Sequence, residues 1–137
     1  MEAVREFLTN ERKTQRDAVM FDIDDTLIDV DTRQTNQPIV DLLFYCKNLG
    51  YKVIIITARP HTKRAVENTK VELRQHRIFW DGLLFTPAED KGFIKRNMGY
   101  RFVLSVGDRM TDVTESLGYI KLPDDKSNRS FFVKNVY

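Results

Sequence analysis

The sequence predicts an α/β fold in which helices cover both faces of a parallel sheet. Short segments composed almost entirely of apolar residues recur along the chain, as in Val53–Ile56. Charged segments whose apolar residues recur at helical spacing lie between them. Strands that are apolar throughout are buried on both faces, which is typical of parallel sheets sandwiched between helices. We therefore predict a three-layer, doubly wound α/β architecture.

Length and composition are those of one globular domain. The chain has 137 residues, 42% of them hydrophobic and 31% charged, so we expect residues 1–137 to form a single domain. No apolar run approaches the ~20 residues of a membrane helix, so we expect no membrane contact. Lys and Arg number 22 and Asp and Glu 20, an excess too small to indicate a nucleic-acid partner by itself.

The first half of the chain is expected to alternate helices with strands. Glu2–Arg16 is polar with a thin apolar edge, which predicts an N-terminal helix. Ala18–Ile23 is apolar and predicts a buried strand. After a polar loop at Asp29–Asn36, Gln37–Asn48 has a proline in its first turn and a glycine just past its end, which predicts a helix. Tyr51–Ile56 predicts the second buried strand.

The second half continues this alternation. The charged segments have helical spacing, and the apolar ones are short enough to be strands. The predicted helices are His61–Gln75, Lys91–Met98 and Asp108–Leu117, the predicted strands are Gly82–Phe85, Arg101–Val106 and Tyr119–Leu122, and residues 123–137 are predicted to be an irregular tail.

Acidic residues follow two of the predicted strands. They are Asp22, Asp24 and Asp25 after the first strand and Asp108 and Asp112 after the fourth. Ligands of doubly wound sheets bind at the carboxyl ends of the strands, so these side chains are expected to share one site. Carboxylates so close together repel one another unless a cation compensates them. Oxygen ligands without a His or Cys cluster predict Mg²⁺, with phosphate supplying further oxygens.

These residues resemble, in chain order, the four motifs of the haloacid dehalogenase-like phosphatase superfamily. The first is DIDDT from Asp22, and the second is Thr57 at the end of a strand. The third is Lys91 at the start of a helix, and the fourth is Gly107-Asp108 followed by Asp112. Four separated motifs, each at a strand end or a helix start, make the resemblance specific. It implies a Rossmann-like core and phosphatase activity.

A finer resemblance is to the class B acid phosphatase-like branch of this superfamily. It rests on the segments FDIDDTLID, ITARP, VGDRMTDV and GYIKLP and covers about Ala18–Pro123. Two features depart from the branch. It is often secreted, whereas residues 1–10 lack the apolar core of a secretory signal, and it usually has a glycine where Ala58 stands. The lone Cys46 also fits a reducing compartment, so we expect a cytoplasmic protein.

The resemblance implies roles for the acidic residues. Asp22 would be the nucleophile that forms an aspartyl-phosphate. Asp24 would protonate the leaving group and then take a proton from the attacking water. Mg²⁺ would be held by Asp22, by the backbone carbonyl of Asp24 and by Asp108. Asp112 would hold a metal-bound water or bind the metal directly.

It also implies roles for neighbouring polar residues. Thr57 would donate to a phosphoryl oxygen, and Lys91 would neutralise charge and hold Asp22. Lys95, four residues further along the same predicted helix, competes with Lys91 for this role. Thr26 and Arg59 are the candidate substrate-binding residues. Thr26 would brace the acidic loop, and for Arg59 a plain loop position is the alternative.

The spacing of the motifs leaves no room for a cap domain. Residues 23–56 and 58–90 are each about the length of one βαβ step, which takes about 30 residues. The site is therefore expected to be open to solvent. An open site admits small substrates without enclosing them, and it also admits bulky ones.

We expect a Mg²⁺-dependent phosphomonoesterase that acts on small phosphorylated metabolites or nucleotides. One alternative is a phosphatase on polymers, either nucleic-acid ends or phosphoproteins. The basic residues of the helix that begins at His61 are interspersed with Glu67 and Glu72, which disfavours nucleic acid. A third alternative is a phosphoacceptor signalling module. It is disfavoured because this sequence has no acceptor aspartate between Thr57 and Asp81. The sequence leaves the oligomeric state open.

Overall fold

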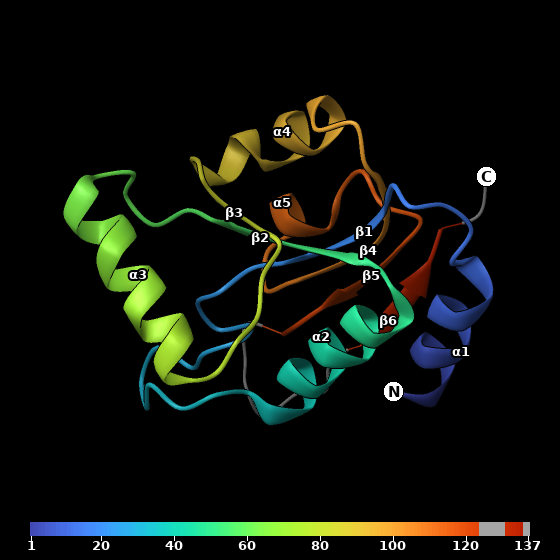
Figure 1. Cartoon of the computed structure of the whole chain (residues 1–137), viewed down its shortest axis with the longest axis horizontal. Coiled ribbons are helices and arrows are strands. Elements are labelled where there is room, and N and C mark those ends of the chain that lie inside the picture. The colour runs from blue at the N-terminus through green and yellow to red at the C-terminus, as the bar shows by residue number, and fades with distance from the viewer. Residues whose placement is uncertain (124–130, 136–137) are drawn as a thin grey trace.

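A largely parallel sheet forms the centre of the molecule (Figure 1). The computed structural model describes residues 1–123 and 131–135. Within these residues the sheet has six strands in the order β3-β2-β1-β4-β5-β6. β1 to β5 are parallel, and β6 is antiparallel to β5. The strands are β1 (Asp17–Phe21), β2 (Lys52–Thr57), β3 (Gly82–Phe85), β4 (Arg101–Gly107), β5 (Gly118–Lys121) and β6 (Phe131–Lys134).

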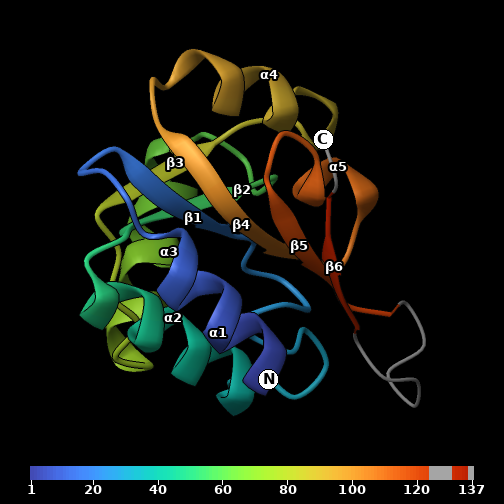
Figure 2. The same cartoon turned by 90° about the vertical axis from the view of Figure 1, so that its right-hand side faces the viewer.

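Helices cover both faces of this sheet. They are α1 (Glu2–Glu11), α2 (Gln37–Leu49), α3 (Lys63–Gln75), α4 (Lys91–Asn97) and α5 (Met110–Val113), with a 3₁₀ turn, η1, at Ala88–Asp90. α1 and α2 lie on one side of the sheet, and α4 and α5 lie on the other (Figures 1 and 2). α3 contributes to the same core as α1 and α2. The predicted three-layer, doubly wound fold class is confirmed.

The central strands are largely apolar because they face a core on both sides. On β1, Val19 and Phe21 belong to the larger core, beneath α1 and α2. Ala18 and Met20, which alternate with them, belong to the smaller core beside Ile94 of α4. Alternate side chains of a strand point to opposite faces of a sheet, so every residue of β1 is buried.

The N-terminal helix is shorter than predicted. It ends at Glu11, whereas the sequence analysis extends it to Arg16. Beyond it, the backbone N–H groups of Lys13 and Thr14 donate to Asp17 Oδ2 at 2.6 and 3.0 Å. This side chain satisfies N–H groups that a longer helix would have bonded internally, and it turns the chain into β1.

The predicted helix over Asp108–Leu117 is also wrong in extent. Only Met110–Val113, α5, is helical. Glu115 has a positive φ of 61°, a conformation that does not continue a right-handed helix. Lys95 Nζ meanwhile binds the backbone carbonyl oxygens of Asp112, at 2.7 Å, and Thr114. A side chain from α4 therefore takes the place of helical hydrogen bonds.

The irregular tail predicted for residues 123–137 is wrong over Phe131–Lys134. These residues form β6, which pairs with β5 and adds an antiparallel edge to the sheet. Residues 124–130 and 136–137 lie outside the described part of the chain.

The long helix predicted from His61 begins two residues later. α3 starts at Lys63 because Thr62 caps it, its side chain accepting from the Ala65 N–H at 3.1 Å. α2 ends at Gly50, whose φ of 94° suits a glycine after a helix. Among the described residues no helix is both long and apolar enough to cross a membrane.

A buried carboxylate joins the end of α1 to the sheet. Besides its bonds to the chain preceding β1, Asp17 accepts from Arg101 Nη1 at 3.1 Å, and Arg101 also binds Glu11 at 2.8 Å. Burial by itself would raise the pKa of Asp17. The hydrogen bonds from Lys13, Thr14 and Arg101 outweigh it and lower the pKa from 3.8 to about 2.

We expect Asp17→Asn to lower the free energy of unfolding by about 2 kcal/mol at pH 7. Because the pKa is depressed in the folded state, this contribution is present above about pH 4 and is lost as the pH falls toward about 2. Urea unfolding of variant and parent at both pH extremes measures the difference, with the exposed Glu6→Gln as control. An equal loss of unfolding free energy at neutral and acidic pH would show that the ionised form of Asp17 is not what stabilises the fold.

Candidate functional site

The carboxyl ends of β1 and β4 open into a cavity of about 310 Å³. Seven of the residues singled out from the sequence line it: Asp22, Asp24, Asp25, Arg59, Lys91, Asp108 and Asp112. They come from segments that the parallel topology brings to one edge of the sheet. The site therefore lies where the sequence analysis expects it.

One buried ammonium lies between two buried carboxylates at this edge. Lys91 Nζ donates to Asp22 Oδ1 at 2.9 Å and to Asp112 Oδ1 at 2.6 Å. The side chains of Lys91 and Asp112 are 2% and 1% exposed, so solvent screens their charges little. Burial would lower the pKa of Lys91, but the two carboxylates outweigh burial and raise it. Lys91 is therefore held in its charged form.

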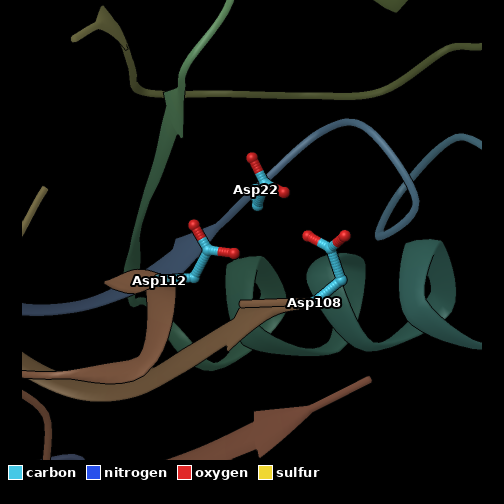
Figure 3. A group of neighbouring side chains, drawn as sticks. All are labelled: Asp22, Asp108 and Asp112. Atoms are coloured by element: carbon cyan, nitrogen blue, oxygen red, sulfur yellow. The ribbon is translucent and has the colours of Figure 1, made fainter. Parts of the chain in front are cut away.

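Asp108 brings a third carboxylate to the same place (Figure 3). One oxygen from each of Asp22, Asp108 and Asp112 lies within 4.8 Å of the others. Burial and the charge of Asp112 raise the pKa of Asp22, and burial raises that of Asp108. A single ammonium cannot balance three carboxylates. The cluster consists of hard oxygen donors and fits a divalent cation.

A glycine allows one of these carboxylates to approach the sheet. A Cβ atom on Gly107 would lie 2.2 Å from Asp112 Cβ and 2.4 Å from Asp112 Oδ2. No side chain larger than hydrogen can occupy this position while Asp112 keeps its place. Asp112 Oδ2 also accepts from the Arg109 N–H at 3.0 Å, which fixes the turn into α5.

The carboxylate of Asp24 is bound separately, by an arginine. Arg59 Nε donates to Asp24 Oδ2 at 3.0 Å and Arg59 Nη2 to Asp24 Oδ1 at 2.7 Å, a bidentate pair. The same guanidinium contacts Glu72 Oε1 at 2.8 Å and donates to Thr69 Oγ1 at 3.1 Å. Burial by itself would lower the pKa of Arg59, but both carboxylates outweigh it and raise the pKa. Asp24 thus faces an arginine, whereas Asp22 faces a lysine.

The loop after β1 is tightly folded around the acidic residues. Asp25 has a φ of 57°, and its N–H donates to the carbonyl of Ile28 at 2.7 Å. Thr26 is fully buried, and its hydroxyl donates to Asp22 Oδ2 at 3.4 Å. Thr26 therefore contacts Asp22 from within the protein, while Asp25 lies at the cavity.

The two candidate lysines of α4 occupy different surroundings. Lys91 contacts Asp22, whereas Lys95 Nζ donates to Ser105 Oγ at 3.1 Å and to two backbone carbonyls of the α5 turn. Burial lowers the pKa of Lys95 to about 8. Of the two, Lys91 is thus the one placed beside Asp22. Thr57, the last residue of β2, is buried, and its Oγ accepts from the Arg59 N–H at 3.1 Å.

Three residues near the site were not singled out by sequence reasoning. Glu72 and Thr69 reach Arg59 from α3, and Arg109 lines the cavity. Thr69 and Glu72 are three residues apart, which places them on one face of a helix. That spacing is visible in the sequence, but which helix face meets Arg59 depends on how α3 packs.

A family of known proteins matches the part of the chain that carries these residues. A sequence model of the haloacid dehalogenase-like hydrolases matches residues 19–114. A chain of the Pnkp1/Rnl/Hen1 complex is 26% identical, with a TM-score of 0.57 over 70% of this chain and 40% of that one. A chain of the Pnkp1/Rnl/Hen1 RNA repair complex is also 26% identical, with a TM-score of 0.56 over 69% and 37%. The present chain thus corresponds to about two fifths of those chains. No curated protein matches it. The family model does not distinguish branches of the family, so the resemblance to the class B acid phosphatase-like branch stays a prediction.

We expect Lys91→Met, studied in chelator above the raised pKa of Asp22, about 8, to lower the free energy of unfolding by about 3–5 kcal/mol, because two buried carboxylates lose their shared cation. Adding Asp22→Asn should recover part of this loss, since one of the two charges is removed. Urea unfolding of both single variants and the double variant measures the coupling. Lys63→Met, at the exposed start of α3, is the control. Losses that simply add would show that Lys91 and Asp22 do not interact.

Proposed function

Because the chain belongs to the haloacid dehalogenase-like hydrolase family, we propose that it is a Mg²⁺-dependent phosphomonoesterase that uses Asp22 as its nucleophile. The observation that carries the proposal is the buried Asp22–Lys91–Asp112 arrangement beside Asp108, at the floor of a cavity. We propose small phosphorylated metabolites or nucleotides as substrates. The segments between the motifs are filled by α2 and by α3 with β3, so the described residues form no cap over the cavity, which leaves it open to small substrates as well as to bulky ones.

Asp22 attacks the phosphorus atom, and the bond to the leaving oxygen breaks as the aspartyl-phosphate forms. Lys91 holds the Asp22 carboxylate in place through its 2.9 Å contact and offsets the negative charge that approaches it. Thr57 Oγ already accepts a backbone hydrogen bond, which leaves its hydroxyl hydrogen for a phosphoryl oxygen. These residues prepare a site for a tetrahedral anion.

Asp24 is the proton donor and acceptor of the two half-reactions. It gives a proton to the leaving oxygen and later takes one from the water that cleaves the aspartyl-phosphate. It stands two residues from Asp22 on the same turn, and its side chain is 37% exposed, so both the leaving group and water can reach it. Its carboxylate must leave Arg59 for at least part of each cycle, because Arg59 occupies both of its oxygens.

Asp22 and Asp108 would hold Mg²⁺, with Asp112 beside them and the Asp24 carbonyl as a further ligand. The ion supplies charge neutralisation and orientation of the phosphoryl group when bound. Asp108 has the greater capacity to bind it, because both oxygens of Asp112 are engaged by Lys91 and the Arg109 N–H.

The second candidate function is removal of a phosphate from a nucleic-acid end. The similarity to chains of an RNA repair complex favours it. Arg109 at the cavity also suits a further phosphate of a polymer chain. We keep the small-substrate proposal first, because acidic residues of α3 are interspersed with its basic ones.

Phosphate release from nitrophenyl phosphate, mononucleotides and 3′- or 5′-phosphorylated oligonucleotides tests the proposal. We expect Asp22→Asn to lose activity at least about 10³-fold while keeping a cooperative melting transition, because the change is nearly isosteric. We expect oligonucleotide and mononucleotide to share a shallow salt dependence. A steep dependence seen with the oligonucleotide alone would favour the second candidate. Retained activity in Asp22→Asn would refute the nucleophile.

We expect chelation to abolish activity and Mg²⁺ to restore it. Calorimetric titration with Mg²⁺ should show roughly 10–100-fold weaker binding in Asp108→Ala and a smaller loss in Asp112→Ala. The exposed Asp41→Ala, on α2, is the control. Full activity in excess chelator, or an unchanged affinity in Asp108→Ala, would contradict the metal site.

A further inference from the structure

Glu72 connects α3 to the proton donor through an arginine. Its carboxylate contacts Arg59 Nη2 at 2.8 Å, and its side chain is only 17% exposed. Thr69, one turn earlier on the same face of α3, accepts from Arg59 Nη1 at 3.1 Å. The guanidinium therefore has two partners on α3 and one, Asp24, on the loop after β1.

Glu72 also binds a second arginine, from a different loop. Arg33 Nη2 donates to Glu72 Oε2. Arg33 has a φ of 60°, a conformation uncommon for a residue with a side chain. Asp29 fixes this loop, because its carbonyl accepts from the Arg33 N–H at 2.8 Å and its side chain accepts from two further N–H groups. Glu72 thus lies between two arginines whose backbones are independently held.

The charges of these four groups balance. Asp24 and Glu72 carry two negative charges, and Arg33 and Arg59 carry two positive ones. Without Glu72, the described contacts of Arg59 would leave Asp24 as its one carboxylate partner. A carboxylate bound through both oxygens by a guanidinium cannot present a proton to a leaving group.

We propose that Glu72 is a positioning residue for proton transfer. It retains the guanidinium of Arg59 on α3, so that Asp24 can leave the arginine, protonate the leaving oxygen and return. This inference rests on the proposed phosphomonoesterase function and assigns Glu72 a place in it. Glu72 itself touches neither the phosphoryl group nor the leaving group.

The test compares two substrates that differ in their need for a proton. Nitrophenyl phosphate has a good leaving group, and glycerol phosphate has a poor one. We expect Glu72→Gln to lower kcat about tenfold on glycerol phosphate and less than about twofold on nitrophenyl phosphate, with KM nearly unchanged. Asp24→Asn should show the same pattern with larger losses. Glu72→Asp, which keeps the charge on a shorter side chain, should fall between Glu72→Gln and the parent.

Glu67→Gln, on an exposed face of α3, is the matched control and should match the parent on both substrates. Melting temperatures show whether each variant is folded. If Glu72→Gln does not fold, the kinetics of Glu72→Asp are used for the comparison with the parent. Equal losses on both substrates, a change in KM alone, or kinetics like those of Glu67→Gln would overturn the role of Glu72 but not the proposed function. A parent enzyme that releases phosphate from neither substrate would overturn both.

Discussion

The ammonium of Lys91 is the interaction on which the rest of the site depends. Removing a lysine from water is costly, and the structure offsets this cost with two carboxylates in direct contact. The same ammonium allows Asp22 and Asp112 to be buried side by side, which their mutual repulsion would otherwise oppose. Asp22 directly follows β1, Lys91 begins α4 and Asp112 lies in α5, so their mutual attraction ties the end of β1 to the two helices on one face of the sheet.

The neighbouring residues serve this arrangement in different ways. Gly107 has no side chain, so Asp112 can lie directly against the end of β4. Lys95 binds the backbone of the α5 turn and thereby fixes the segment that carries Asp112. The two lysines of α4 are one helical turn apart and point to the same region. One binds the side chains of the site, and the other binds the backbone that supports them.

Much of the fold could be predicted because the central strands are largely apolar and each motif stands at a strand end or a helix start. The residues that share the cavity followed from the topology, since parallel strands end at one edge. The helix ends were harder, because α1 and the α5 turn are ended by Asp17 and Lys95, side chains from other elements. β6 was missed because it is stabilised by pairing with β5, a contact that the local pattern of residues does not encode.

The contacts of individual side chains depend on how the elements pack, which the spacing of residues in the sequence does not predict. The sequence analysis could not separate Lys91 from Lys95, because both lie on one helix face and differ only in what lies opposite them. Glu72 was considered only as one of the acidic residues interspersed among the basic ones of its helix. Its partners, Arg33 and Arg59, belong to loops at the ends of other strands, so only the assembled molecule brings them together.

The packing of α1 bears on where this domain begins. The segment that matches the family starts at residue 19, after α1 and in the middle of β1. Yet Val4, Phe7 and Leu8 of α1 belong to the main core, and Tyr51 donates a hydrogen bond to the Leu8 carbonyl at 2.6 Å. Trimming the chain to the matched segment would expose the apolar surface that α1 covers. The segment recognised by sequence is therefore smaller than the packed unit, whose core includes α1.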